Sequence, residues 1–142
     1  MSKTRKIGII PHFYDEDNEV IQNFIKANPS AVMISMKHFE RWEDVIDAIA
    51  SCEMIISSSL HGIIVSDAYG VPNVWVEFSE KVIGKGFKFQ DHFAAVKRTV
   101  SAPLQIKEVT DFDYAIKAAN DYQPIQIDLQ PLMDACPFKL PF

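Results

Sequence analysis

Serine, histidine and glycine residues follow directly after a short apolar run in the middle of the chain. Residues 54–56 are apolar, and Ser58, Ser59, His61 and Gly62 come within the next six positions. Free N–H groups at the start of a helix, with serine hydroxyls beside them, bind phosphate or carboxylate. An imidazole in the same turn can donate to that anion or transfer a proton. These residue types predict an anion site with His61 as its acid, base or phosphate-stabilising group.

The same turn also has a purely structural interpretation. In that interpretation one serine caps the helix and His61 packs against the preceding helix. In the functional interpretation Gly62 lets a ligand approach the backbone closely, because glycine has no Cβ. His12 is a second candidate for the site, since it follows the apolar run of residues 7–10 and Pro11.

A group of lysines lies further along the chain. Lys81, Lys85 and Lys88 occupy three of eight successive positions and are interleaved with glycine and phenylalanine residues. We expect this segment to be tied to the body of the protein, because Phe87 and Phe89 are too apolar to lie free in water. The lysines are candidates to bind the same anion. A solvated surface loop and a single-stranded nucleic acid site are the alternatives.

Alternating strands and helices must position these side chains. Apolar runs predict four parallel strands at about residues 5–11, 31–36, 53–58 and 73–78. Amphipathic patterns between them predict helices: the first follows an N-cap at Asn18, and the others cover residues 39–49 and 60–69. This order predicts a single Rossmann-like domain over residues 1–142, with three α/β layers and a mainly parallel sheet.

The topology predicts which residues meet. Ligands of open α/β sheets bind beyond the carboxyl ends of the strands. We therefore expect His12, His38, residues 57–62 and residues 77–79 to lie at one edge of the sheet.

The pattern is looser after residue 78. Residues 84–98 are rich in glycine, lysine and phenylalanine and are expected to form a long ordered loop. Residues 104–106 predict a short strand, and Thr110 with Asp113 predicts a capping box for a helix that runs to about residue 120. A last short amphipathic helix is expected over residues 129–136.

Composition limits the class of protein. The chain has 142 residues, 48% of them hydrophobic, which is typical of a globular domain. Its formal net charge of −5 gives no basic field for nucleic acid or a membrane surface. Cys52 and Cys136 lack metal-ligand spacing and are expected to be reduced. No apolar run is long enough to span a membrane, so we expect a cytoplasmic protein.

Other site chemistry has less support. His12, His38 and His61 have the residue type of a metal triad, but their spacing fits no metal motif, and no metal is expected. Pro11 and His12 stand after the first strand in place of the glycine-rich turn that binds dinucleotides or ATP.

Four segments, in this order, resemble a known family, the polysaccharide pyruvyltransferases. They are Ile-Ile-Pro-His at 9–12, the run at 52–64 that contains Ser-Ser-Ser-Leu-His-Gly, Asp-Ala-Tyr-Gly-Val-Pro-Asn-Val-Trp at 67–75, and Gly-Lys-Gly-Phe-Lys-Phe at 84–89. Residues 127–138 resemble the family's usual ending. The resemblance covers the C-terminal half of a typical member.

This resemblance implies a two-domain arrangement like that of GT-B glycosyltransferases, with the present chain as the donor-binding half. It implies transfer of pyruvate from phosphoenolpyruvate to two sugar hydroxyls, which forms a ketal on an exopolysaccharide or cell-surface polysaccharide without a cofactor. The family's donor-site histidine corresponds to His61, within the Leu60-His61 pair; Ser59 stands where some members carry arginine.

The partners implied by the resemblance are phosphoenolpyruvate, a sugar or lipid-linked oligosaccharide acceptor, and a separate N-terminal half or a second copy. Two other functions stay open. One is a non-catalytic anion-binding remnant of the same fold, and the other is a sugar-nucleotide glycosyltransferase domain.

Overall fold

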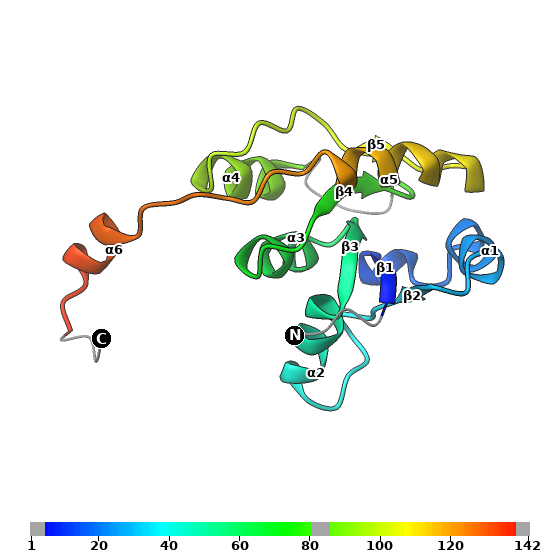
Figure 1. Ribbon diagram of the computed structural model, residues 1–142, viewed down its shortest axis with the longest axis horizontal. Helices are drawn as coiled ribbons and strands as arrows, with labels where there is room; N and C mark the ends of the chain where they lie inside the picture. Colours follow the sequence, from blue (N-terminus) through cyan, green and yellow to red (C-terminus); the bar gives the residue numbers. More distant parts are fainter. Residues whose placement is uncertain (1–4, 81–85, 139–142) are drawn as a thin grey trace.

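Five parallel strands form the central sheet. The computed structural model describes residues 5–80 and 86–138 (Figure 1). The strands are β1 (Arg5–Ile10), β2 (Ala31–Met33), β3 (Cys52–Ser57), β4 (Asn73–Glu77) and β5 (Leu104–Gln105). Their order is β2-β1-β3-β4-β5, and every pair is parallel. The α/β class and the four predicted strands are confirmed, although β2 ends earlier than expected.

Helices cover both faces of the sheet (Figure 1). The α-helices are α1 (Glu19–Ala27), α2 (Trp42–Ala50), α3 (Leu60–Ala68), α4 (Phe87–Ala95), α5 (Phe112–Asn120) and α6 (Gln130–Ala135), and the 3-10 turns are η1 (Phe13–Asp15) and η2 (Val109–Asp111). Buried side chains of α1 and α5 share one core cluster with the sheet, and those of α2, α3 and α4 belong to the clusters on the other face. Strands covered in this way are apolar on both faces, which explains their continuous hydrophobic runs.

Aromatic pairs mark the two cores. Phe24 of α1 and Phe112 of α5 stack with ring centroids 4.0 Å apart on one face. Trp75 of β4 and Phe89 of α4 stack at 4.7 Å on the other. Stacked pairs of this kind add to the free energy gained by burying the rings.

The start of α1 agrees with the sequence. Asn18 Oδ1 accepts a hydrogen bond from the Val20 N–H at 2.9 Å, as expected for an N-cap. The start of α5 differs from the expected capping box, because η2 precedes the helix. Asp111 Oδ2 there accepts hydrogen bonds from the Lys107 and Glu108 N–H groups.

The prediction of a long loop over residues 84–98 was wrong, because the helix α4 occupies most of the described part of this segment. Phe89, Phe93 and Val96 are buried at positions i, i+4 and i+7, which is a helical stripe. Lysine and polar residues on the opposite side of α4 obscure this pattern in the sequence. Phe89 and Phe93 are tied to the body of the protein as expected, but Phe87 is 76% exposed, so the expectation was wrong for that residue.

After α5 the chain first lines a hollow with residues of α3 and α4, as far as Leu129, and then carries α6 away from the body of the protein (Figure 1). Leu132 and Phe138 are 71% and 78% exposed on this segment. No helix in residues 5–80 and 86–138 is long and apolar enough to cross a membrane.

Candidate functional site

The order of the strands creates a crevice between β1 and β3. The chain leaves β1 towards α1 on one face and leaves β3 towards α3 on the other, so the two loops diverge. Sheets of this order bind ligands at this position, beyond the carboxyl ends of the strands. A pocket of about 410 Å³ lies here, lined by His12, Phe13, Met36, Ser59, Leu60, His61, Gly86, Phe87, Lys88 and Phe89.

The three serines before α3 have different roles. Ser57 Oγ lies 3.1 Å from the Ile10 carbonyl and accepts from the Ser59 N–H at 3.0 Å. Ser58 Oγ accepts from the backbone N–H of His12 at 2.8 Å. Ser59 is buried and lines the pocket, yet its side chain makes no capping hydrogen bond to α3. Two serines therefore build the turn, and the third keeps a hydroxyl available to a ligand.

The first turn of α3 carries N–H groups that have no partner within the helix. Because no side chain caps this end, these groups and the positive end of the helix dipole are available beside Ser59. His61 lies in the same turn, is exposed and lines the pocket. This arrangement can hold phosphate or carboxylate next to an imidazole.

His12 forms the facing wall of the pocket. Its Nδ1 accepts a hydrogen bond from the Tyr14 N–H at 3.2 Å, and its carbonyl accepts from the Asp15 N–H at 2.8 Å. Partial burial lowers the pKa of His12 below the ordinary histidine value, although the Asp15 carboxylate acts in the opposite direction. The imidazole is therefore neutral near pH 7. Asp15 is itself held by a hydrogen bond from the Ser79 hydroxyl at 2.5 Å.

The start of α4 brings Lys88 to the pocket. Gly86 precedes the helix with a φ of +86°, in the left-handed region. A Cβ at this position would lie 2.7 Å from the Trp75 ring, so only glycine fits here. The contact with Trp75 fixes where Phe87 and Lys88 enter the pocket.

The pocket brings together five of the residues that the sequence singled out, namely His12, Ser59, Leu60, His61 and Lys88. Two others, Ser58 and Gly62, are buried beneath it. A Cβ on Gly62 would lie 2.5 Å from Ser57 Oγ and 3.0 Å from Ile10 Cδ1, so its geometry serves the packing of α3 on the sheet. The remaining two, Lys81 and Lys85, lie outside the described residues.

His38 lies apart from this pocket, in the loop after β2. Its Nε2 is 4.0 Å from Glu16 Oε2, and its side chain is exposed. Within residues 5–80 and 86–138, no group of three histidine, cysteine or acidic residues could hold a metal ion.

Sequence reasoning missed Met36 and Gly86 as pocket residues. Met36 lies in the loop after β2, where its apolar side chain gives no sign of a binding role.

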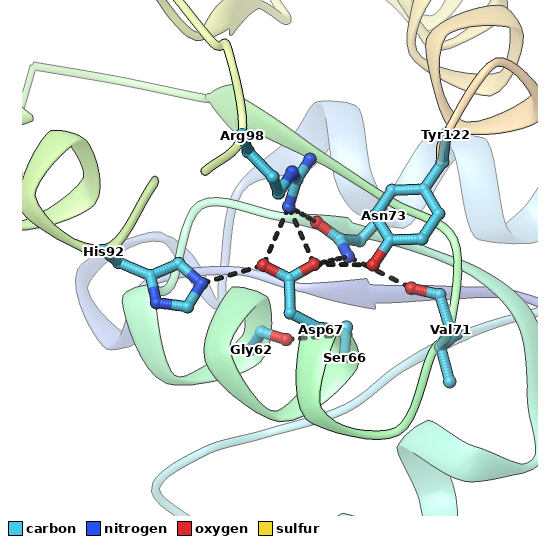
Figure 2. A network of polar contacts seen from close by, with 8 residues as sticks. All are labelled: Gly62, Ser66, Asp67, Val71, Asn73, His92, Arg98 and Tyr122. Carbon is cyan, nitrogen blue, oxygen red and sulfur yellow. Dashed lines mark hydrogen bonds and ion pairs between the residues drawn. The ribbon is translucent and has the colours of Figure 1, made fainter. Parts of the chain in front are cut away.

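A second polar cluster, also missed, surrounds Asp67 (Figure 2). Asp67 Oδ1 accepts from Asn73 Nδ2 at 2.9 Å and from the Tyr122 hydroxyl at 2.8 Å. Both carboxylate oxygens accept from Arg98 Nη1, at 2.9 and 3.0 Å. His92 Nε2 lies 2.8 Å from Oδ2. This network ties α3, α4, β4 and the segment after α5 together.

The Asp67 network is separate from the candidate site. Burial acts to raise the pKa of Asp67, but hydrogen bonds from Asn73, His92 and Tyr122 and the charge of Arg98 outweigh it and lower the pKa. Because Asp67 lies in the last turn of α3 and Asn73 begins β4, the network is at the opposite edge of the sheet. A hollow of about 750 Å³ beside it is lined by residues 96–102 and 121–126 rather than by the residues with candidate chemistry.

Comparisons with known proteins identify the family. The family model described as polysaccharide pyruvyl transferase matches residues 1–80, which include β1 to β4 and the serine turn. The match does not extend to residues 84–89 and 127–138, whose resemblance stays a prediction. Over 102 aligned residues the chain is 30% identical to an uncharacterized protein of Acanthamoeba polyphaga mimivirus.

The alignment with that viral protein covers 61% of this chain and 30% of the relative, so the chain spans less than a third of the relative's length. No solved structure matches the chain at a significant level. The family match covers more than half of the chain and includes the strands and turn that form most of the pocket. The chain belongs to the polysaccharide pyruvyl transferase family.

Proposed function

We propose that this chain binds phosphoenolpyruvate in the pocket between His12 and His61 and forms the donor side of a pyruvyl transferase. The observation that carries the proposal is the placement of Ser59, a buried residue. It lines the pocket beside the uncapped start of α3 without a capping hydrogen bond of its own. Phosphoenolpyruvate brings a phosphate and a carboxylate, which match these donors and the Lys88 ammonium.

The proposed reaction forms a ketal. The C3 carbon of phosphoenolpyruvate takes a proton and becomes a methyl group, while two sugar hydroxyls bond to C2 in turn. The C2–O bond to phosphate breaks, and the phosphate leaves with its bridging oxygen. The proton of one sugar hydroxyl ends on C3, and the proton of the other ends on the released hydrogen phosphate.

His61 is the residue that we assign to proton transfer in this reaction. It is exposed to the pocket and lies in the turn that binds the anion. An imidazole titrates close to neutral pH, so it can accept a hydroxyl proton and deliver a proton to carbon. Lys88 then offsets negative charge on the phosphate as the C2–O bond breaks.

The acceptor side comes from outside this chain in our proposal. The pocket lies at an open sheet edge, and transfer needs two substrates held in aligned geometry. We propose that a second domain or chain closes the cleft, in a GT-B-like arrangement, and that the acceptor is a sugar of a polysaccharide or lipid-linked oligosaccharide. The reaction then belongs to exopolysaccharide or cell-surface polysaccharide synthesis on the cytoplasmic side. The chain alone is expected to bind the donor weakly and to transfer pyruvate poorly.

Calorimetric titration of the chain with phosphoenolpyruvate, inorganic phosphate and UDP tests the donor assignment. We expect phosphoenolpyruvate to bind more tightly than the other two ligands. The variants Ser59→Ala and His61→Ala are expected to bind phosphoenolpyruvate more weakly than the wild type. UDP binding more tightly than phosphoenolpyruvate would favour a sugar-nucleotide glycosyltransferase instead. Binding of phosphoenolpyruvate without any acceptor-dependent phosphate release, even with the complementary half present, would favour a non-catalytic module.

A further inference from the structure

His12 is held in one orientation by its surroundings. Its backbone N–H donates to Ser58 Oγ at 2.8 Å, and its Nδ1 accepts from the Tyr14 N–H at 3.2 Å. The ring also packs against Phe13 and Tyr14, with ring centroids 4.3 and 4.8 Å away.

The hydrogen bond to Nδ1 determines where the imidazole carries its proton. A neutral imidazole has one protonated nitrogen and one acceptor nitrogen. Since Nδ1 accepts from the Tyr14 N–H, the proton of the neutral ring is on Nε2. Adding a second proton at Nδ1 would point two N–H groups at each other and break the cap of η1. The turn therefore disfavours the imidazolium form.

We infer that His12 binds the anionic donor substrate as a neutral imidazole, through its Nε2–H group, and carries no proton in the transfer. The identity of the substrate in this inference rests on the proposed function. His12 then orients the anion from the wall opposite α3, and His61 is the histidine that exchanges protons. The two histidines of the pocket thus have different chemistry although both are near the same ligand.

The surroundings of His12 are consistent with this assignment. In the described part of the chain, the titratable groups next to it are Tyr14 and Asp15 in its own turn, and His61 and Lys88 across the pocket. The Asp15 carboxylate favours the imidazolium, but partial burial of the ring outweighs it and lowers the pKa of His12. The Ser58 hydroxyl holds the backbone and adds no charge.

Long-range ¹H–¹⁵N NMR on protein labelled at histidine tests the protonation state directly, in the free wild-type chain. His12→Gln identifies the signals of His12 among the four histidines. We expect His12 to be the neutral Nε2–H form at pH 7 and to titrate below the ordinary histidine pKa. A neutral ring protonated on Nδ1, or an imidazolium at pH 7, would overturn the inference.

Binding of inorganic phosphate and phosphoenolpyruvate to two variants tests the donor role. Gln places an N–H close to the position of Nε2–H, whereas Ala removes the donor. We expect His12→Ala to lower the affinity for both anions about 10- to 100-fold, which corresponds to the loss of one hydrogen bond to a charged group. His12→Gln is expected to retain most of the affinity. Equal losses in the two variants, or no loss in His12→Ala, would contradict the inference.

The two anions separate this inference from the proposed function. If phosphate binding depends on the donor at position 12 but phosphoenolpyruvate binds no better than phosphate, the inference stands and the proposed substrate is wrong. If phosphoenolpyruvate binds best but His12 has the other tautomer, the inference is wrong and the proposed function stands.

Discussion

The Oγ atom of Ser58 lies 2.8 Å from the backbone nitrogen of His12, 46 residues earlier in the chain. This hydrogen bond joins the loop after β1 to the loop after β3 at the place where the two loops diverge. Together with the Ser58 N–H, which donates to the Ile10 carbonyl at 3.0 Å, this hydroxyl holds the two walls of the candidate pocket together. Ser59, its neighbour, has a hydroxyl that makes no such connection.

Replacing Ser58 by alanine is expected to affect both folding and binding. The partly buried His12 N–H loses its acceptor, which costs about 1–3 kcal/mol of the free energy of unfolding. Urea denaturation measures this loss, and phosphate titration measures the accompanying drop in affinity. Ser59→Ala is the matched control. It is expected to lower the affinity for phosphate while the urea midpoint stays near that of the wild type. A larger stability loss for Ser59→Ala than for Ser58→Ala would contradict these roles.

Gly86→Ala is expected to be more damaging than Gly70→Ala. Both glycines have positive φ angles, +86° and +67°, but a Cβ at Gly70 meets no atom within 4 Å. Gly70→Ala should therefore cost only the left-handed backbone strain, about 1–2 kcal/mol. Gly86→Ala adds a clash with Trp75, which raises the cost by about 1–3 kcal/mol.

Chemical denaturation and the fluorescence of Trp75 detect this difference. The exposed Trp42 is first replaced by phenylalanine in all proteins so that Trp75 gives the signal. We expect a changed emission spectrum and weaker phosphate binding for Gly86→Ala alone. Equal behaviour of the two alanine variants would show that the Trp75 contact does not position α4.

Asp67→Asn is expected to destabilise the fold by about 3–5 kcal/mol at pH 7, since it leaves Arg98 without its buried partner. The pKa of Asp67 is lowered in the folded protein, so its contribution is complete above the unfolded carboxyl pKa. That contribution is lost as the pH falls through the lower folded value. Denaturation curves at a series of acidic pH values give the free energy of unfolding at each pH. This free energy should fall more steeply with decreasing pH for the wild type than for Asp67→Asn.

Asp91→Asn is the control for Asp67→Asn. Asp91 is an exposed neighbour of His92 on α4, and its replacement changes the charge by the same amount. We expect little change in the urea midpoint for this variant. A similar loss for both variants would mean that net charge, rather than the Asp67 network, controls stability.

Lys88→Ala is expected to weaken phosphoenolpyruvate binding about 2- to 5-fold, a modest effect because the side chain is exposed. The difference from the wild type should shrink as salt is added, because salt screens exposed charges. Lys117→Ala removes the same charge from α5, on the other face of the sheet, and should leave the affinity unchanged. Equal effects of the two replacements would assign the effect to net charge.

The sequence was sufficient for the local features of the fold. Continuous apolar runs placed β1, β3 and β4 to within one or two residues, since strands covered on both faces have no alternation to misread. Asn18 identified the start of α1 because its cap is a bond to a residue two positions away. The helix α4 was missed because its buried stripe has only Phe89, Phe93 and Val96, set among lysines and other polar residues.

The candidate site was predictable where topology brings strand ends together. His12, Ser59 and His61 meet for that reason. The functions of Ser58 and Gly62 were not predictable, because each depends on a contact with the β1 region that is distant in the sequence. The Asp67 network joins residues up to 55 positions apart, and nothing in the local pattern indicates such pairs.

The register of β1 with β3 also has a consequence for how the chain folds during synthesis. Ile10 pairs with Ser57, which is made 47 residues later. At a synthesis rate of about 5–20 residues per second, the edge of β1 that pairs with β3 has no partner for about 2 to 9 seconds. During that interval the centre of the future sheet is an exposed apolar edge that other nascent chains can pair with. Residues 7–10 are therefore the part of the sheet that most needs protection from wrong pairing while the chain is being made.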